Sequence, residues 1–272
     1  MASQSAARGQ VAKLTAGADA IEIKATIPER QVAVALGRYG LTEDNDEERY
    51  VYFFDTPALD LLAAGIIARA RRVVGDEHDS TIKFRPVDPA QVPNQWRKYR
   101  GFKIEADASE KSVVKSASFT MPVAKGLIKR VVAGEAPIAA LFSQEQQLFL
   151  LSMANRKIDH SKVIVLGPLS ANVWKFEEPA CPWPLTAELW RREDGATLVE
   201  ASIKAPIVQA AAAMAGFMAF LAEVGAERDT DQQAKTRWAL DYYVAKARKT
   251  TPRARTAPGP ATASARRRTP AS

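Results

Sequence analysis

The sequence predicts an α+β protein, and the main observation is an alternation of apolar and charged residues in seven short segments. Strict alternation has the period of a β-strand, so each segment places its charges on one face and its apolar residues on the other. Near the end of the chain, apolar residues at helical spacing in 206–224 and 229–248 predict two helices that pack on the sheet. The alternating segments are 21–24, 68–71, 82–85, 102–105, 174–177, 187–190 and 199–204.

The alternating strands allow two arrangements. In a one-sided antiparallel sheet the charged face is solvated and laced with salt bridges, and the pattern alone favours this arrangement. If the sheet closes into a barrel surrounded by helices, the charged faces line the inside instead. Charges removed from water cost several kcal/mol each, so such an interior must be wet, filled with ions or internally paired. A closed barrel would therefore be a charged tunnel that needs a charged ligand.

Composition indicates a soluble globular chain whose basicity belongs to its end. The formal net charge of 272 residues is +7, but eight of the 38 basic residues and none of the 31 acidic residues lie in 246–272. The remainder carries about −1, which argues against a basic nucleic-acid-binding domain. A single cysteine excludes an internal disulfide, and no apolar segment predicts a signal peptide or a membrane span. We expect a cytoplasmic protein without a membrane partner.

The chain is expected to divide into three parts. Residues 1–18 are small and polar and predict a disordered N-terminus, 19–248 predict one domain that includes the C-terminal helices, and 249–272 predict a disordered basic tail. The tail would contact polyanions only weakly. Within the domain, 109–153 is expected to be helical. Strands are expected at 20–27, 50–54, 66–74, 80–85, 101–107, 155–166, 171–177, 186–193 and 196–204.

Basic residues outnumber acidic ones on the charged strand faces, eight to five. An excess of about three positive charges matches a triphosphate that a divalent cation partly neutralises, because Arg and Lys bind phosphate oxygens and carboxylates hold Mg²⁺ or Mn²⁺. The basic residues are Lys24, Arg69, Arg71, Lys83, Arg85, Lys103, Lys175 and Lys204, and the acidic residues are Glu22, Glu105, Glu177, Glu188 and Glu200.

Four motifs resemble the CYTH domain of the triphosphate tunnel metalloenzymes. They are Glu22-Ile23-Lys24, the stretch YFFDTPALDLLAAGI at 52–66, Arg69-Ala70-Arg71 and Thr81-Ile82-Lys83. The resemblance covers about 18–205 and is strongest over 50–85. That superfamily includes class IV adenylate cyclases, thiamine triphosphatases and inorganic triphosphatases. The resemblance implies a closed eight-stranded antiparallel β-barrel surrounded by helices, with the charged faces turned inward.

The resemblance also implies roles for individual residues. It makes Arg69, Arg71 and Lys83 phosphate-binding residues, and Arg85 extends the same strand face. Its catalytic set here would be Glu22, Lys24, Lys83 and Glu200, and its metal ligands would come from Glu22, Glu200, Glu188 and Asp159. The chain departs from the family pattern at Ala20 and Ser202, where the family has glutamates.

These roles imply divalent-metal-dependent hydrolysis of an inorganic or small organic triphosphate, or of polyphosphate, with Mg²⁺ or Mn²⁺ as cofactor. Adenylate cyclase chemistry on ATP is one alternative. A non-catalytic binder of polyphosphate or nucleotide is another, which the two missing glutamates favour. A barrel whose charged face serves only as a docking surface is a fourth reading. The oligomeric state does not follow from the sequence.

Overall fold

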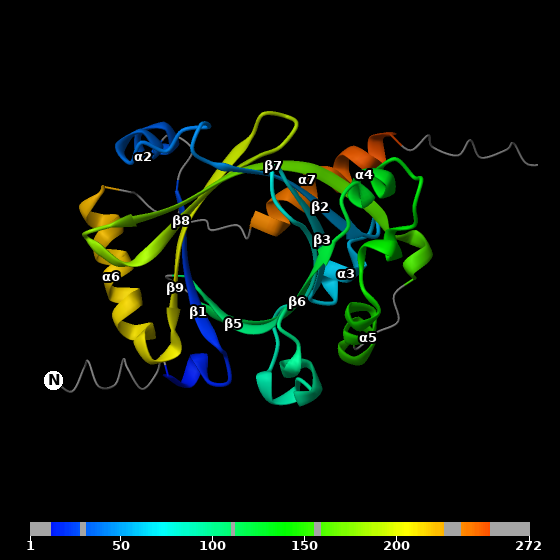
Figure 1. Cartoon of the computed structure of the whole chain (residues 1–272), viewed down its shortest axis with the longest axis horizontal. Coiled ribbons are helices and arrows are strands. Elements are labelled where there is room, and N and C mark those ends of the chain that lie inside the picture. The colour runs from blue at the N-terminus through cyan, green and yellow to red at the C-terminus, as the bar shows by residue number, and fades with distance from the viewer. Residues whose placement is uncertain (1–11, 28–30, 110–111, 155–158, 226–234, 251–272) are drawn as a thin grey trace, which may run out of the picture.

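Nine strands close into a barrel in the computed structural model, which describes residues 12–27, 31–109, 112–154, 159–225 and 235–250. The strands follow one another around the barrel in the order β1-β5-β6-β4-β3-β2-β7-β8-β9 (Figure 1). Their bounds are β1 Ala20–Ile27, β2 Glu47–Asp55, β3 Ile66–Val73, β4 His78–Phe84, β5 Phe102–Ala108, β6 Val113–Val123, β7 Ile164–Glu178, β8 Cys181–Arg191 and β9 Thr197–Pro206.

The closed barrel confirms the expected architecture, but the expectation of eight antiparallel strands is wrong in two respects. The barrel has nine strands, and β1 runs parallel to β5 while it pairs antiparallel with β9. The expected helix over 109–153 is interrupted by β6, whose inner face carries the uncharged Ser118 and Thr120 and therefore shows no charge alternation. The two strands expected at 155–166 and 171–177 are replaced by one long strand, β7.

Apolar strand faces point outward and are buried under helices, which leaves the charged faces inside. On β1, Ile21 and Ile23 have no exposed surface and pack in one cluster with Phe217 of α6. Phe119 of β6 and Phe149 of α5 are equally buried in a second cluster. The helices are α2 Val32–Arg38, α3 Asp60–Ala63, α4 Leu127–Val132, α5 Gln144–Met153, α6 Ala210–Glu223 and α7 Lys235–Thr250.

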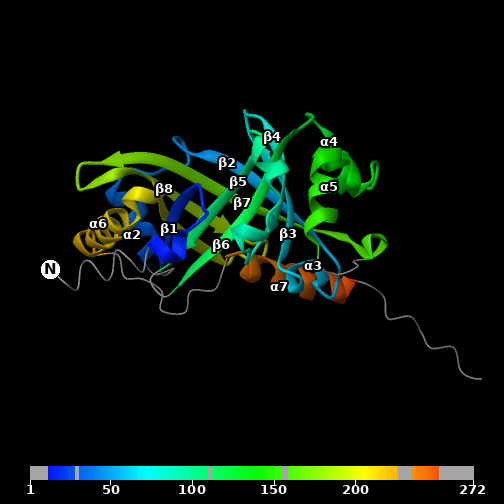
Figure 2. The same ribbon diagram turned by 90° about the horizontal axis from the view of Figure 1, so that it is seen from below.

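Helix α7 packs across one end of the barrel (Figure 2). Leu240 and Val244 lie in a third apolar cluster with Phe53 of β2 and Leu169 of β7. The Tyr243 hydroxyl also donates a hydrogen bond to the Pro168 carbonyl oxygen. The first residue of α7 is thereby held over the barrel interior.

Asp55 fixes the connection from β2 to β3. Its buried carboxylate accepts hydrogen bonds from the backbone N–H groups of Thr56, Leu61 and Leu62, so it caps α3 from outside the helix. This segment belongs to the motif at 52–66, which therefore has a structural role: it sets where β3 begins.

Buried hydrogen bonds join α5 to two barrel strands. Gln146 donates from Nε2 to the carbonyl oxygens of Ser80 in β4 and Phe119 in β6. Ser143 and Gln146 also form a capping box at the start of α5. The helix is thereby oriented by both the apolar cluster and directed hydrogen bonds.

The described residues account for only part of the expected termini. The expected disorder of 1–11 and 251–272 lies outside the described residues, whereas 12–15 form a helical turn in which Thr15 is buried. None of the described helices is both long and apolar enough to cross a membrane.

Gly101 tests how tightly β5 and β6 approach at the edge of the interior. A Cβ atom there would lie 2.0 Å from the Thr120 carbonyl oxygen, which is backbone. We expect Gly101→Ala to lower the free energy of unfolding by about 2 kcal/mol because the paired strands must move apart. Gly37→Ala, with nothing within 4 Å in α2, is the control and should be neutral or stabilising by at most about 1 kcal/mol. Urea denaturation measures both, and equal effects would contradict this account.

Candidate functional site

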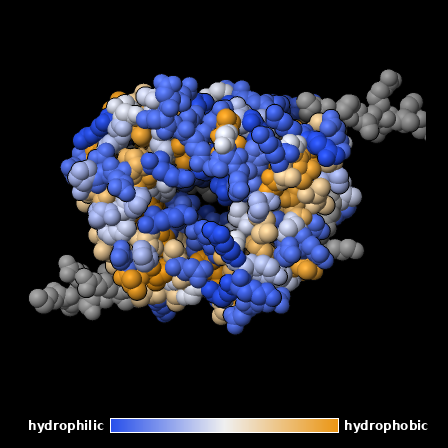
Figure 3. All heavy atoms as spheres, in the orientation of Figure 1, coloured by the Kyte–Doolittle hydropathy of each residue, from blue (hydrophilic) through white to orange (hydrophobic). Residues whose placement is uncertain are grey.

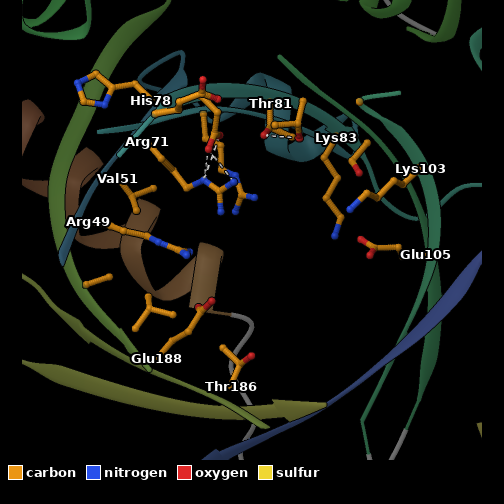
Figure 4. A pocket seen from close by; sticks show the side chains of 18 of the residues that line it. Arg49, Val51, Arg71, His78, Thr81, Lys83, Lys103, Glu105, Thr186 and Glu188 are labelled. Atoms are coloured by element: carbon orange, nitrogen blue, oxygen red, sulfur yellow. Dashed lines mark hydrogen bonds and ion pairs between the residues drawn. The ribbon is translucent and has the colours of Figure 1, made fainter. Parts of the chain in front are cut away.

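A cavity of about 990 Å³ occupies the barrel interior. All nine strands and α7 contribute to its wall, and its volume lies in the range of small-molecule sites. Hydrophilic side chains surround a hollow at the centre of the molecule (Figure 3), and basic and acidic groups point into it from opposite strands (Figure 4).

The cavity wall carries ten basic and six acidic side chains, an excess of four positive charges. Such an excess inside a partly enclosed space concentrates the positive potential and favours anions. The basic residues are Lys24, Arg49, Arg69, Arg71, Lys83, Arg100, Lys103, Lys175, Lys204 and Lys235, and the acidic residues are Glu22, Asp76, Glu77, Asp79, Glu105 and Glu188.

Arg69 has no acidic partner among the described residues. Its Nε atom is shielded from solvent and makes no hydrogen bond, and no carboxylate of the described chain lies within ion-pair distance of it. Burial, together with the positive charge of Arg71, lowers the pKa of Arg69 to about 10. Asp79 and Glu188 offset this lowering of the pKa only in part, so the Arg69 guanidinium would be stabilised by an anion that enters the cavity.

Asp107 is the centre of the densest ion-pair cluster. Its side chain is 2% exposed, and its carboxylate lies 3.1 Å from Lys83 Nζ, 3.6 Å from Lys24 Nζ and 3.6 Å from Arg85 Nε. Ser116 Oγ also donates a hydrogen bond to it. Burial would raise the pKa of Asp107, but the three cations outweigh burial and hold it well below the usual range.

The pKa values of the two lysines in this cluster are shifted in opposite directions. Burial lowers the pKa of Lys83, and Asp107 compensates only in part. Burial would also lower the pKa of Lys24, but Glu200 and Glu22 raise it further than burial lowers it. Lys24 therefore keeps its charge under all ordinary conditions, whereas Lys83 holds its proton less tightly than an exposed lysine.

Three further carboxylates of the cavity wall are paired with basic groups as well. Glu22 lies 2.8 Å from Lys24, Glu105 lies 3.0 Å from Lys204, and Asp79 lies 2.8 Å from an Arg71 nitrogen. Burial would raise the pKa of Glu22, but Lys24 and Lys204 outweigh it, so the pKa is lowered and Glu22 is ionised at neutral pH.

The carboxylates expected to hold a divalent metal ion do not form a metal site. Among the described residues, no three histidine, cysteine, aspartate or glutamate side chains converge to hold a metal ion. Lys235 Nζ instead lies against Glu188 and 2.8 Å from Glu200 Oε1. As they stand, the residues of this structure do not fit a protein-bound Mg²⁺ or Mn²⁺ ion, which requires several free oxygen ligands.

The structure brings most of the residues expected from the sequence to the cavity wall. Arg85 and Glu200 do not line the cavity but pair with groups around it, through Asp107 and through Lys24 and Lys235. Asp159 lies away from the cavity, 51% exposed and paired with Lys162. Glu177, also expected on the inner face, is exposed and does not line the cavity. The expected residues in the wall are Glu22, Lys24, Arg69, Arg71, Lys83, Lys103, Glu105, Lys175, Glu188 and Lys204.

Several charged residues of the site were not expected from the sequence, among them Asp107, Arg49 and Lys235. Asp107 continues the alternation of 102–105 by one more residue, so the signal was present. Arg49 lies on the inner face of β2, just before the segment 50–54 that was expected to form this strand. Lys235 reaches the cavity from a helix, and strand periodicity carries no information about it.

The two positions that depart from the family pattern, Ala20 and Ser202, have different neighbours in the barrel. Ala20 pairs with Glu105 across β1 and β5, so the neighbouring strand supplies carboxylates at that position. Ser202 is buried and pairs with Lys24 and with Thr186, and no carboxylate stands at its place.

No family profile and no curated protein matches this sequence, but solved structures share its fold. One is a candidate adenylate cyclase from Bacillus halodurans, with a TM-score of 0.57 and 14% identity over 80% of this chain and 96% of that one. Another is a candidate adenylyl cyclase from Hippeastrum with a dominant triphosphatase activity, with a TM-score of 0.57 and 14% identity over 81% and 95%. The chain therefore has the barrel fold that its resemblance to the triphosphate tunnel metalloenzymes implies.

Asp107 offers a test of the ion-pair cluster. Asp107→Asn should lower the free energy of unfolding at neutral pH by about 3 kcal/mol, because three cations lose their buried partner. A carboxylate with a lowered folded-state pKa stabilises fully above its unfolded pKa of about 4 and loses this effect as the pH falls through the folded value. The difference from wild type in urea denaturation should therefore shrink below about pH 4.

Asp79→Asn is the matched control because Asp79 pairs with one basic residue of the described chain, Arg71, and is more exposed than Asp107. We expect it to cost less than about 1 kcal/mol. If Asp107→Asn costs no more than this control, Asp107 does not organise the cluster.

Proposed function

We propose that the barrel binds the triphosphate group of an inorganic or small organic triphosphate, or of polyphosphate, and hydrolyses it. The observation that carries this proposal is the guanidinium of Arg69, which points into a positively charged cavity without an acidic partner. A polyanion is the ligand class that removes the cost of such a charge. The named triphosphatase activity of the Hippeastrum protein, which shares the fold, supports the same class of substrate.

Basic residues from six strands would hold the phosphate chain. Arg69 and Arg71 extend from β3 and give forked contacts, whereas Lys24 and Lys83 act as point charges from β1 and β4. Lys103, Lys175 and Lys204 complete the wall, and Arg85 supports Asp107 from behind. Because a phosphoryl-transfer transition state keeps its negative charge on oxygen, positioning and charge stabilisation by these groups supply most of the catalysis.

Glu22 is the carboxylate we assign to the chemical step. In that step a water oxygen bonds to the terminal phosphorus while the bridging P–O bond breaks. The bonding electron pair leaves with the shortened phosphate chain, and the water proton passes to the Glu22 carboxylate. Glu22 lines the cavity and is ionised at neutral pH, as a proton acceptor must be.

A divalent ion, Mg²⁺ or Mn²⁺, would enter as part of the substrate, chelated by the phosphate oxygens. Triphosphates carry such an ion in solution, and Mg²⁺ sites commonly combine substrate phosphates with few protein carboxylates. Glu22 is the wall carboxylate that we assign to such a chelated ion, which would replace its contact with Lys24 Nζ, whereas Glu188 and Glu200 are held together by Lys235.

A non-catalytic binder of polyphosphate or nucleotide is the second candidate. It is favoured by one observation: the cavity carboxylates Glu22, Glu105 and Glu188 each pair with a lysine. The two candidates differ in turnover and share the anion site.

A product screen decides between these functions. The full chain is incubated with tripolyphosphate, polyphosphate, thiamine triphosphate and ATP, each with Mg²⁺ or Mn²⁺. We expect orthophosphate release from at least one compound. Cyclic AMP and pyrophosphate from ATP would identify a cyclase instead, and binding without any product would identify a binder. Neither binding nor turnover of any compound would contradict all three.

Replacement of Arg69 by methionine tests the anion site itself. Arg69→Met should weaken tripolyphosphate binding at least about tenfold in calorimetry, a loss of about 1.4 kcal/mol. Without ligand it should be at least as stable as wild type, because an unpaired cation is removed from the interior.

Arg72→Met is the matched control. Arg72 follows Arg71 on β3 but is placed on the outer face, over the Tyr50 ring. We expect it to leave tripolyphosphate affinity unchanged. An equal loss in both variants would show that net charge, rather than the cavity, determines binding.

A further inference from the structure

Lys235 places an ammonium group between two carboxylates of the barrel. It is the first residue of α7, and the start of this helix lies within the outline of the barrel (Figure 1). Its Nζ atom forms ion pairs with Glu188 Oε2 and with Glu200 Oε1, the latter at 2.8 Å. Its side chain is 14% exposed. The two glutamates come from β8 and β9, at positions that face each other in the register.

The surroundings of this ammonium form a cage for a cation. The Trp190 ring centroid lies 4.6 Å from Lys235 Nζ, and the Trp190 indole Nε1 donates to Glu188 Oε2 at 3.0 Å. Lys24 Nζ also lies 3.9 Å from Glu200 Oε1. Two carboxylates and an aromatic face are groups that attract positive charge, and a lysine ammonium offers only donors to them.

The position of Lys235 is fixed by the packing of its helix. Ala239 and Leu240 are buried in the apolar cluster with Val51 and Leu166. One turn further along α7, the Tyr243 hydroxyl is bonded to the barrel backbone. The packing of α7 against the barrel therefore holds Lys235 next to the two carboxylates.

We infer that the Lys235 ammonium is a resident cation of the barrel, which occupies the place between Glu188 and Glu200 that a divalent ion would otherwise take. The negative charges of these two carboxylates are thus partly neutralised by a group of the chain itself. The excess positive charge of the cavity then remains available to an anion without any protein-bound metal ion. Burial would raise the pKa of Glu188, but Lys235 outweighs it and lowers the pKa, in keeping with a close ion pair.

The inference deepens the proposed function because it assigns the cation of the same cavity. It can fail separately, since cation binding by the two glutamates is measured in the absence of any phosphate compound. The screen for phosphate release would still decide the proposed function on its own.

Removal of the ammonium should create a divalent cation site. Mn²⁺ binding to the full chain is measured by titration of the free-ion paramagnetic resonance signal. We expect weak binding in wild type and at least about tenfold tighter binding in Lys235→Met. The double variant Lys235→Met/Glu200→Gln should lose this gain. Equal Mn²⁺ affinity in wild type and Lys235→Met, whether tight or weak, would overturn the inference.

Two controls separate the site from general charge effects. Arg237→Met removes a positive charge from the same helix, where Arg237 pairs on the surface with Asp241, and should leave Mn²⁺ affinity as in wild type. Lys235→Arg retains the positive charge and should also bind Mn²⁺ as weakly as wild type. A gain in either control equal to that of Lys235→Met would overturn the inference.

A second measurement works on the unaltered protein, and so does not depend on the folding of any variant. The Trp190 indole N–H reports on the cage because it donates to Glu188. When Mn²⁺ is added in stoichiometric amount, the indole signals of the five tryptophans should show no selective broadening at Trp190. Selective broadening of the Trp190 signal in wild type would mean that the metal ion enters despite Lys235, and would overturn the inference.

Discussion

Closure of the barrel is the constraint on which the rest of the structure depends. Once the sheet closes, the apolar residues of alternating strands face the helices and every inner charge must find water, a partner or a ligand. The chain meets this requirement unevenly. On the side of β1, β5 and β9, carboxylates and lysines neutralise one another around Asp107, Glu105 and Glu200. On the side of β3, Arg69 keeps an unmatched charge.

The cavity therefore has one side where the charges are paired and one side where a positive charge is unpaired. The paired side supplies rigidity, because each ion pair ties neighbouring strands together and Asp107 alone contacts cations from β1, β4 and the residue that follows β4. The unpaired side supplies the attraction for an anion. Helix α7 adds to the paired side, since Lys235 neutralises carboxylates that would otherwise offset the excess positive charge.

The sequence predicted the part of the site that alternation and motifs encode. Residues such as Lys24, Arg69 and Lys83 lie on alternating strands within matched motifs, and the structure places all three in the cavity wall. The same reasoning could have identified Asp107, which is the next charged residue of the alternation on its strand. It could not have identified Lys235, because the position of Lys235 depends on how a helix packs across the barrel end, and such a tertiary contact leaves no local sequence pattern.

The limits of the fold prediction have a similar cause. Strand β6 has small and hydroxylated inner residues, so it lacks the alternation of apolar and charged residues by which the other strands were predicted. The parallel pairing of β1 and β5 joins segments about eighty residues apart, and periodicity within each segment does not determine such a pairing. The place of Asp159 outside the cavity likewise follows from chain path rather than from residue type.

The central claim is that the barrel interior is an anion site that needs no protein-bound metal ion. The most direct measurement is the melting temperature of the full chain in excess chelator at constant ionic strength, with orthophosphate, pyrophosphate or tripolyphosphate. A ligand that binds only the folded state stabilises it by an amount that increases with its affinity. The account predicts a rise that grows with the number of phosphates. No rise with tripolyphosphate, either in chelator or after a divalent ion is restored, would contradict it.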